Sequence, residues 1–375
     1  KDTTISTGPI RAAVIGVGTR GQRVLEALQR CDGFTLVGLA DRNASRVEPL
    51  AARLGVPSFT DSRTLFSQAG PQAVFITTPP MVNADLIAAC AQRGVHVWKL
   101  APLARDLREA AAMTRQMQQA KLTFMVGTYR RFMEPYRHAA ELQSQLGAMQ
   151  LARAEYLFNW GPIAQWRTDR QAAGGGALME LGYHFVDLLL WTLGLPEDVF
   201  SLTSVSAHNA KPAINDRPAQ VPCDTDDTAA AIMRYPSGTM ASLVTSRISG
   251  PVTESLSLHG LEGSIVANPA RFSLRDPDGG VREEFNSLPG PVDGLEHQIE
   301  AFGEAIVAGG ETHRCSAREN LLTMAIIEAM YLSQKTGQAE SPGELLKTTG
   351  FTVAQCTPPA ENHDRLPDHE PAEPD

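Results

Sequence analysis

Three residues near the middle of the chain have the side chains and spacing of an acid–base site. Glu180, Tyr183 and His184 lie within two turns of a predicted helix, in the stretch GGGALMELGYHFVD. Glu180 and His184 are four residues apart, so on a helix they share one face. A carboxylate beside an imidazole raises the pKa of the histidine and orients its ring, which would make His184 a general base for a hydroxyl group. The other interpretation is structural, because a single histidine on a helix is more often structural than catalytic.

One lysine stands at the end of an apolar stretch. Only six of the 33 basic residues are lysines, and Lys99 follows Val97 and Trp98 in a segment typical of a buried strand. A lysine removed from water can have a pKa low enough to act as an acid or a base. Alternatively, Lys99 extends to the surface or pairs with a carboxylate. The sequence leaves both interpretations open.

A glycine pattern lies between a predicted strand and a predicted helix. Gly16, Gly18 and Gly21 fit Gly-x-Gly-x-x-Gly. The first glycine allows a tight turn, the second lets the backbone approach a pyrophosphate, and the third lets helix and strand pack closely. Thr19 and Arg20 begin the helix, where free N–H groups favour a bound anion. The alternative is a glycine-rich turn without a ligand.

An acidic residue completes the dinucleotide pattern. Asp41 ends the second predicted strand, twenty residues after Gly21. A carboxylate at this place accepts hydrogen bonds from the adenosine ribose hydroxyls, which favours NAD over NADP. Arg42 follows directly and could hold a 2′-phosphate, so NADP stays an alternative.

Further candidate ligand contacts follow the third predicted strand, 72–80. Thr77, Thr78 and Pro79 stand at its carboxyl end, the edge at which open α/β sheets bind ligands. The alternative is that the prolines merely end the strand.

Aromatic and basic residues form the predicted substrate side. Tyr129 and Arg130 fall at the junction between the two halves of the chain, and Trp160, Trp166 and Arg167 fall in the loop before the glycines. Aromatic faces and a guanidinium group suit a sugar or a sugar acid. Packing within the loop is the alternative role.

Composition limits the class of protein. A chain of 375 residues with 43% apolar and 20% charged residues is globular and long enough for two domains. The net charge of −9 argues against nucleic acid or an anionic membrane as the partner, and no apolar run is long enough to span a membrane. The five scattered cysteines suggest reduced thiols and a cytoplasmic protein, although the chain begins without Met and an exported form stays open. No spacing of His, Cys, Asp or Glu indicates a metal site.

The candidate residues need a scaffold, and the pattern of elements predicts one. From residue 10 to 128, apolar strands alternate with amphipathic helices, which indicates a doubly wound parallel sheet covered on both faces. From 129 to 350, alternating strands indicate an α+β domain with an open, mostly antiparallel sheet, and Gly174–Gly176 form a predicted hinge before the helix at 178–193. Residues 356–375 are rich in proline and acid, which predicts a disordered tail.

Six stretches in order resemble the Gfo/Idh/MocA oxidoreductases, a family of sugar and polyol dehydrogenases and their relatives. They cover the chain from about residue 10 to 340, and they are AVIGVGTRG, LAD, TTPP, GTYRRFMEPY, GGGALMELGYHFVDLLLWTLG and HGLEGSI. The resemblance implies an N-terminal Rossmann domain, a C-terminal α+β domain and a nicotinamide cofactor between them. It also implies a homodimer or homotetramer formed through the C-terminal sheet. It places His184 at the family's main acid–base position and Glu180 where the family usually has Asp.

The chain departs from this family at its Glu-Lys-Pro signature. Aligning Pro102 with the signature proline puts Leu100 at the glutamate and Ala101 at the lysine, so Lys99 comes two residues early. Strand side chains alternate, so positions 99 and 101 point the same way, separated by about 6.6 Å. The length of a lysine side chain would allow the Lys99 ammonium group to reach the usual place.

The resemblance leaves three functions to separate. The first is NAD(P)-dependent oxidation or reduction of a sugar, polyol or derivative, with His184 as general acid–base and Lys99, Tyr183 and Glu180 assisting. The second is a glycoside hydrolase or lyase that retains NAD and oxidises its substrate transiently, which the missing signature keeps open. The third is a non-catalytic NAD(H)-binding protein, because a fold alone does not fix an activity.

Overall fold

Alternating strands and helices in the first third of the chain build a parallel sheet. The computed structural model of the chain describes residues 8–161, 165–205, 213–214, 217–218, 223–287, 294–309 and 313–358. The first sheet has the order β3-β2-β1-β4-β5-β6, and every pair is parallel, as predicted. Its strands are β1 (Ile10–Ile15), β2 (Phe34–Ala40), β3 (Ser58–Phe59), β4 (Ala73–Ile76), β5 (His96–Leu100) and β6 (Phe124–Gly127).

Helices cover both faces of this sheet because its strands are apolar on both sides. The covering helices of this region are α1 (Thr19–Leu28), α2 (Ala44–Leu54), α3 (Ser62–Gln68), α4 (Asn83–Arg93) and α5 (Leu107–Gln119). The sequence analysis did not anticipate β3 or α3, because both are too short to show a clear periodicity.

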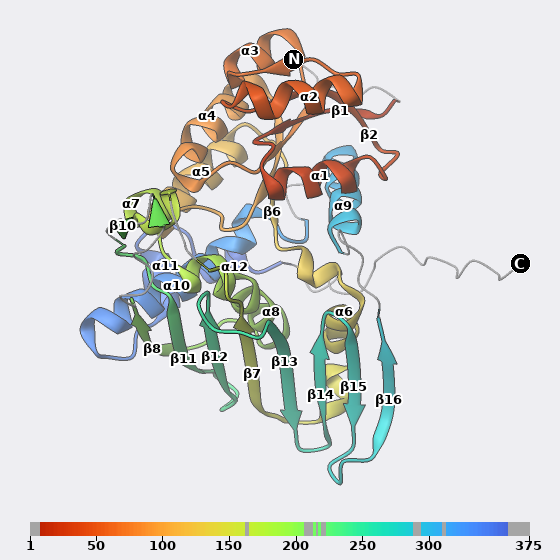
Figure 1. Ribbon diagram of the computed structural model, residues 1–375. Helices are drawn as coiled ribbons and strands as arrows, with labels where there is room; N and C mark the ends of the chain where they lie inside the picture. The colour runs from red at the N-terminus through yellow and green to blue at the C-terminus, as the bar shows by residue number, and fades with distance from the viewer. Residues whose placement is uncertain are drawn as a thin grey trace, which may run out of the picture.

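A helix from much later in the chain also packs on the first sheet. Helix α9 (Leu295–Ala308) lies beside α1 in Figure 1. Its Phe302 stacks on Phe34, with ring centroids 6.2 Å apart, and meets Phe75 edge to face. The range 129–350 was predicted as one domain, but this helix belongs by its packing to the sheet of residues 10–128. The reason is that its apolar face buries against β1, β2 and β4.

The second sheet is mostly antiparallel, as predicted. Its order is β16-β15-β14-β13-β7-β12-β11-β8, and β7 with β12 is its parallel pair. Its strands are β7 (Met149–Leu157), β8 (Asp198–Ser204), β11 (Thr228–Arg234), β12 (Met240–Ser246), β13 (Thr253–Gly260), β14 (Gly263–Asn268), β15 (Arg271–Arg275) and β16 (Val281–Asn286). A separate short pair consists of β9 (Ala213–Ile214) and β10 (Arg217–Pro218).

One face of the second sheet is covered and the other is open. The helices of this region are α6 (Glu134–Leu142), α7 (Arg170–Ala173), α8 (Tyr183–Leu193), α10 (Ala317–Thr336), α11 (Pro342–Lys347) and α12 (Val353–Cys356). Burial alternates along β11, with Ala229, Ala231 and Met233 inside and Ile232 outside. Figure 1 shows this sheet below the parallel sheet, with α8 and α10 behind it.

The disordered tail predicted for 356–375 begins too early. Cys356 is buried at the end of α12, whose first turn is capped by Thr352 and Gln355. Residues 359–375 lie outside the described part of the chain.

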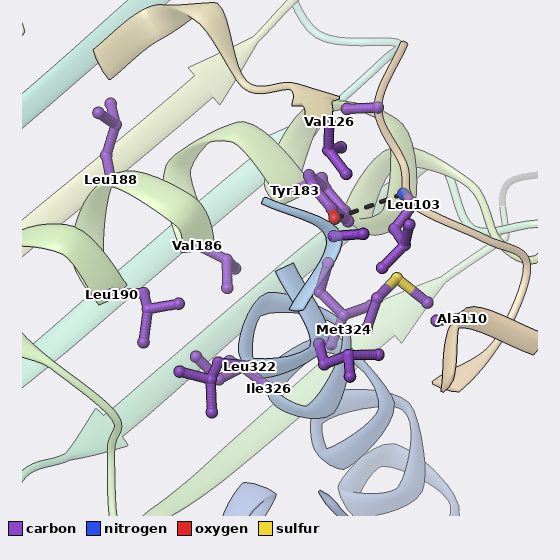
Figure 2. Close-up of a cluster of buried hydrophobic side chains, with 14 of the residues drawn as sticks. Leu103, Ala110, Val126, Tyr183, Val186, Leu188, Leu190, Leu322, Met324 and Ile326 are labelled. Atoms are coloured by element: carbon purple, nitrogen blue, oxygen red, sulfur yellow. Dashed lines mark hydrogen bonds between the residues drawn. The ribbon is translucent and has the colours of Figure 1, made fainter. Parts of the chain in front are cut away.

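A buried apolar cluster joins the two regions. Figure 2 shows Leu103 and Val126 from the parallel-sheet domain against Tyr183 on α8 and Met324 on α10. The Leu103 N–H donates to the Tyr183 hydroxyl across 3.3 Å, so a hydrogen bond also crosses this junction.

The glycines predicted as a hinge are packed tightly. The Asp226 carboxylate accepts hydrogen bonds from Gly176 N and Leu178 N, both at 2.8 Å, and from the Tyr331 hydroxyl at 2.7 Å. The following segment, Leu178–Gly182, is a π-helical turn that leads into α8. The predicted helix at 178–193 is therefore α-helical only from Tyr183 onward.

We expect Gly176→Ala to destabilise the protein. A Cβ at this position would lie 1.9 Å from the carbonyl oxygen of Asp226, a backbone atom that cannot rotate away. Overpacking of this kind costs about 1–3 kcal/mol of unfolding free energy. Gly33→Ala is the control, because a Cβ there meets nothing within 4 Å. Urea unfolding followed by tryptophan fluorescence measures both variants, and equal stabilities would contradict the packing described here.

Candidate active site

A cleft of about 1630 Å³ runs between the two sheets. It follows the carboxyl ends of the parallel strands, where open α/β sheets bind their ligands, and continues onto the second domain. Eighteen of the residues predicted as site residues line it, namely Gly16, Gly18, Thr19, Arg20, Gly21, Asp41, Arg42, Thr77, Thr78, Pro79, Lys99, Tyr129, Arg130, Trp160, Trp166, Arg167, Glu180 and His184. Tyr183 is not among the residues that line the cleft.

The glycine turn has the shape that a pyrophosphate needs. A Cβ on Gly21 would lie 2.1 Å from the Gly16 carbonyl oxygen, so α1 packs against β1 only with glycine there. The nearest atom to a Cβ on Gly18 is 4.0 Å away, which leaves the backbone open to the cleft. Gly18 begins α1 without a side-chain cap, so the first N–H groups of the helix are free to hold an anion.

The end of the cleft next to β2 combines one acid with several arginines. The Asp41 carboxylate accepts from Val17 N and Asn43 N, both at 2.9 Å, and from Arg46 at 3.4 Å. Arg42, Arg46 and Arg63 also line this end. Arg46 was not predicted, although its position in the first turn of α2, shortly after Asp41, would have indicated it.

Asn83, the first residue of α4, is a further polar group near the end of β4 that was not predicted from the sequence. Thr78 donates to the Asn83 Oδ1 atom across 2.7 Å. The Asn83 Nδ2 atom is buried and has no hydrogen-bond partner. Because buried amide groups are normally paired, this orphaned donor fits a site that takes a polar ligand.

Lys99 is buried, not exposed. Its ammonium group donates to the carbonyl oxygens of Leu100, at 3.0 Å, and Pro102. Burial lowers the pKa of Lys99 to about 7, although the Glu109 carboxylate opposes this shift. The alternative that Lys99 extends to the surface is therefore wrong, because the side chain folds back onto the loop that follows its own strand.

His184 is buried at the second-domain wall of the cleft. Its ring lies 5.8 Å from the Tyr129 ring, and its Nδ1 atom is buried without a partner. Burial lowers the pKa of His184 well below 6.5, and the charges of Arg130 and Arg20 lower it further. The imidazole is therefore neutral at neutral pH.

The predicted effect of Glu180 on His184 is wrong. Glu180 Oε1 accepts from Arg167 Nε across 3.0 Å, so the carboxylate is paired with a guanidinium and does not raise the pKa of the histidine. Glu180 belongs to the π-helical turn, where the four-residue spacing of an α-helix does not apply. Its Oε2 atom is buried and unpartnered.

Tyr183 does not have the position expected of an assisting catalytic group. Its hydroxyl donates to Asn320 Oδ1 across 2.8 Å and accepts from Leu103 N, in the buried cluster of Figure 2. Burial raises the pKa of Tyr183 well above 10, so the phenol stays protonated. Tyr183 joins the domains and points away from the cleft lining.

Two ion pairs line the part of the cleft that the second domain forms. Arg167 pairs with Glu180, and Arg130 pairs with Glu254, which lies on β13. The Arg167 guanidinium also lies 4.3 Å from the Trp166 ring centroid and 5.3 Å from that of Trp160. The sequence analysis missed Glu254, because nothing near it in sequence marks it as a partner of residue 130.

A third group of charges lies behind the cleft. Arg131 binds both carboxylate oxygens of Asp187, at 2.7 Å each, and also pairs with Glu319. All three side chains are buried, and they connect the segment after β6 with α8 and α10. The group therefore fixes the helix that carries His184.

Metal-binding clusters and membrane-spanning helices are both absent from the described part of the chain. In the described residues no group of three or more His, Cys, Asp or Glu side chains could hold a metal ion. Within the same part of the chain, no helix is both long and apolar enough to cross a membrane.

We expect the free energy of unfolding to depend on pH because Lys99 is buried. Between about pH 7 and 10.5 the unfolded chain holds a proton that the folded chain has released, so the free energy of unfolding rises with pH. Urea unfolding at several pH values should show wild type gaining stability relative to Lys99→Met across this window. The exposed Lys335→Met is the control for loss of a lysine. A constant difference between wild type and Lys99→Met would show that Lys99 keeps its ordinary pKa.

Comparison with known proteins agrees with this architecture. Residues 10–128 match the oxidoreductase family with an NAD-binding Rossmann fold, and residues 136–266 match the GFO/IDH/MocA C-terminal domain. The D-xylose 1-dehydrogenase (NADP(+)) 2 of Haloferax volcanii is 30% identical, over 86% of this chain and 96% of its own. The inositol 2-dehydrogenase of Rhizobium meliloti is 24% identical, over 85% of this chain and 95% of its own.

Solved structures show the same fold. Levoglucosan dehydrogenase in complex with NADH and levoglucosan has a TM-score of 0.80 and 22% identity, and the match covers 89% of this chain and 99% of that one. The two matched domains, their order and the near full-length relative show that this chain belongs to the Gfo/Idh/MocA family of NAD(P)-binding oxidoreductases.

Proposed function

We propose that the protein is an NAD(P)-dependent dehydrogenase of a sugar, polyol or related hydroxyl compound, with His184 as its general acid–base. The observation that carries this proposal is the neutral, buried His184 imidazole in a cleft that also contains an open pyrophosphate turn. The relatives named for D-xylose and inositol support the substrate class.

The chemistry divides between the cofactor and the side chains. The turn at Gly16, Gly18 and Gly21 would hold a nicotinamide dinucleotide, which would supply hydride transfer to or from a carbon of the substrate. His184 takes the proton of the hydroxyl on that carbon, because its neutral imidazole has a free nitrogen. The nearby Arg130 and Arg20 charges oppose protonation of the ring, which makes the protonated form a strong acid for the reverse reaction.

Lys99 is the proposed assisting group. Its pKa of about 7 gives both protonation states near neutral pH, and it lines the floor of the cleft. Its two bonds to carbonyl oxygens also hold residues 100–102, where the family signature is absent. Glu180 and Arg167, with Trp160, Trp166, Tyr129 and Arg130, form the proposed substrate contacts.

NAD is the proposed main cofactor, with NADP as the alternative. Asp41 stands where the adenosine ribose would lie, and its carboxylate can accept hydrogen bonds from the ribose hydroxyls. Arg42 and Arg46 offer charges for a 2′-phosphate. The NADP-dependent D-xylose relative supports the alternative.

The five cysteines are free, four of them buried, which supports a reducing compartment and a cytoplasmic location.

We expect His184→Ala to lower kcat/KM on the order of 10²–10⁴-fold, the usual scale of acid–base assistance. NADH production on a panel of sugars and polyols measures this, and titration of NADH fluorescence shows that the cofactor still binds. A loss below fivefold would remove His184 from the mechanism. Release of an aglycone without net NADH would instead favour a hydrolase or lyase.

A homodimer or homotetramer formed through the open face of the second sheet is part of the proposal. Phe200, Leu202, Ile232, Met240 and Val244 are exposed there. Ile232 pairs with Phe200, Ala230 lies between Leu202 and Val244, and Met240 pairs with Arg234. Apolar groups gathered on one face are typical of an interface.

We expect Ile232→Glu to dissociate the oligomer, because it places a charge at the centre of this face. Light scattering coupled to size-exclusion chromatography measures the mass. Val307→Glu, exposed on α9, is the matched control. An unchanged mass for Ile232→Glu, or a monomeric wild type, would place the interface elsewhere or remove it.

A further inference from the structure

Two arginines at the proposed substrate end of the cleft, Arg130 and Arg167, are each paired with a glutamate. The Glu254 Oε2 atom accepts from Arg130 Nε at 3.0 Å and lies 2.9 Å from Arg130 Nη2. Glu180 pairs with Arg167 in the same way, through one carboxylate oxygen. Arg130 and Arg167 therefore each have a carboxylate beside them before any substrate binds.

Each pair leaves one buried atom without a partner. These atoms are Arg130 Nη1, which can only donate a hydrogen bond, and Glu180 Oε2, which as a carboxylate oxygen accepts one. The His184 Nδ1 atom is a third buried, unpartnered position. Because unpaired buried polar atoms are costly, the ligand that fits should supply an oxygen to Arg130 and a hydroxyl proton to Glu180.

Arg130 cannot turn away from this site. It is 4% exposed, and its guanidinium group lies 4.9 Å from the Tyr156 ring centroid and 5.5 Å from that of Tyr129. Glu254 and Tyr156 are register partners on neighbouring strands, so the backbone fixes the carboxylate beside the guanidinium. The pair is thus part of the wall of the cleft.

Arg20 and Lys99 also line the cleft. Arg20 lies in the first turn of α1, at the pyrophosphate turn, and its guanidinium group lies 6.0 Å from the ring centroid of Trp160, a ring that Arg167 also contacts. The Lys99 ammonium group is held by two carbonyl oxygens.

We propose that Glu254 is a specificity-determining residue which, by neutralising Arg130, makes the site select an uncharged polyhydroxyl substrate over the corresponding sugar acid. This inference rests on the proposed function and narrows its substrate class. A hydroxyl or carbonyl oxygen satisfies the spare Arg130 N–H. A carboxylate there would also face Glu254, and such a like-charge contact acts against the wrong ligand.

Matched ligand pairs test the inference. Isothermal titration of the NADH-saturated full-length protein uses D-glucose with D-glucuronate, D-galactose with D-galacturonate, and D-mannose with D-mannuronate. Each pair differs by one carboxylate. We expect wild type to bind at least one hexose ten times or more tightly than its uronate. In Glu254→Gln we expect this ratio to fall at least tenfold, because Arg130 gains an unpaired charge.

Two further variants distinguish an effect of the Glu254 charge from a general disturbance of the structure. Glu284→Gln also removes a glutamate paired with an arginine on the same sheet, but outside the cleft lining, so the ratio should not change. Arg130→Gln combined with Glu254→Gln removes both charges, and uronate binding should be lost again.

The outcomes are distinct. The inference is overturned if wild type binds uronates more tightly than hexoses, or if the ratio of hexose to uronate affinity is the same in wild type and Glu254→Gln. Either result leaves the proposed dehydrogenase function intact. If none of the six sugars binds wild type or Glu254→Gln, the proposed sugar site and the inference both fail.

Discussion

One buried carboxylate fixes the start of the helical segment that carries Glu180 and His184 into the cleft. Asp226 binds the N–H groups of Gly176 and Leu178 and the Tyr331 hydroxyl, and so holds the start of the π-helical turn. Glu180 belongs to that turn, and His184 follows it on α8. A helix start held in this way at several atoms has little freedom to rotate. The direction of both side chains therefore depends on a residue that does not itself line the cleft.

The predictable parts of the fold are those in which the interacting residues lie close together in the sequence. The turn at Gly16–Gly21 and the strand ending at Asp41 each depend on neighbours in sequence, and the structure brings them to one edge of one sheet. Cys356 was assigned to a tail because one helical turn, closed by its own cap, is too short to leave a periodic signal.

The contacts that were predicted wrongly or not at all are those between residues that lie far apart in the sequence. Glu180 was paired with His184 by local spacing, but it binds Arg167 instead, because a loop folds back over the π-helical turn. Tyr183 was placed in the cleft because of its neighbours, although its partners, Leu103 and Asn320, come from other segments. Glu254 could not be found at all, since its role exists only through a contact with Arg130, 124 residues away.

The packing of α9 has a consequence for how the cleft can move. The chain leaves the first domain after β6, returns to it as α9 and leaves again before α10, so it crosses between the domains three times. Two domains joined by a single connecting segment can rotate freely relative to each other. Three connecting segments restrict the axes about which the domains can rotate. The Tyr183–Leu103 bond adds a fourth tie beneath the cleft. Bound molecules should therefore enter and leave through small rearrangements at the rim of the cleft, while the residues at its floor hardly move.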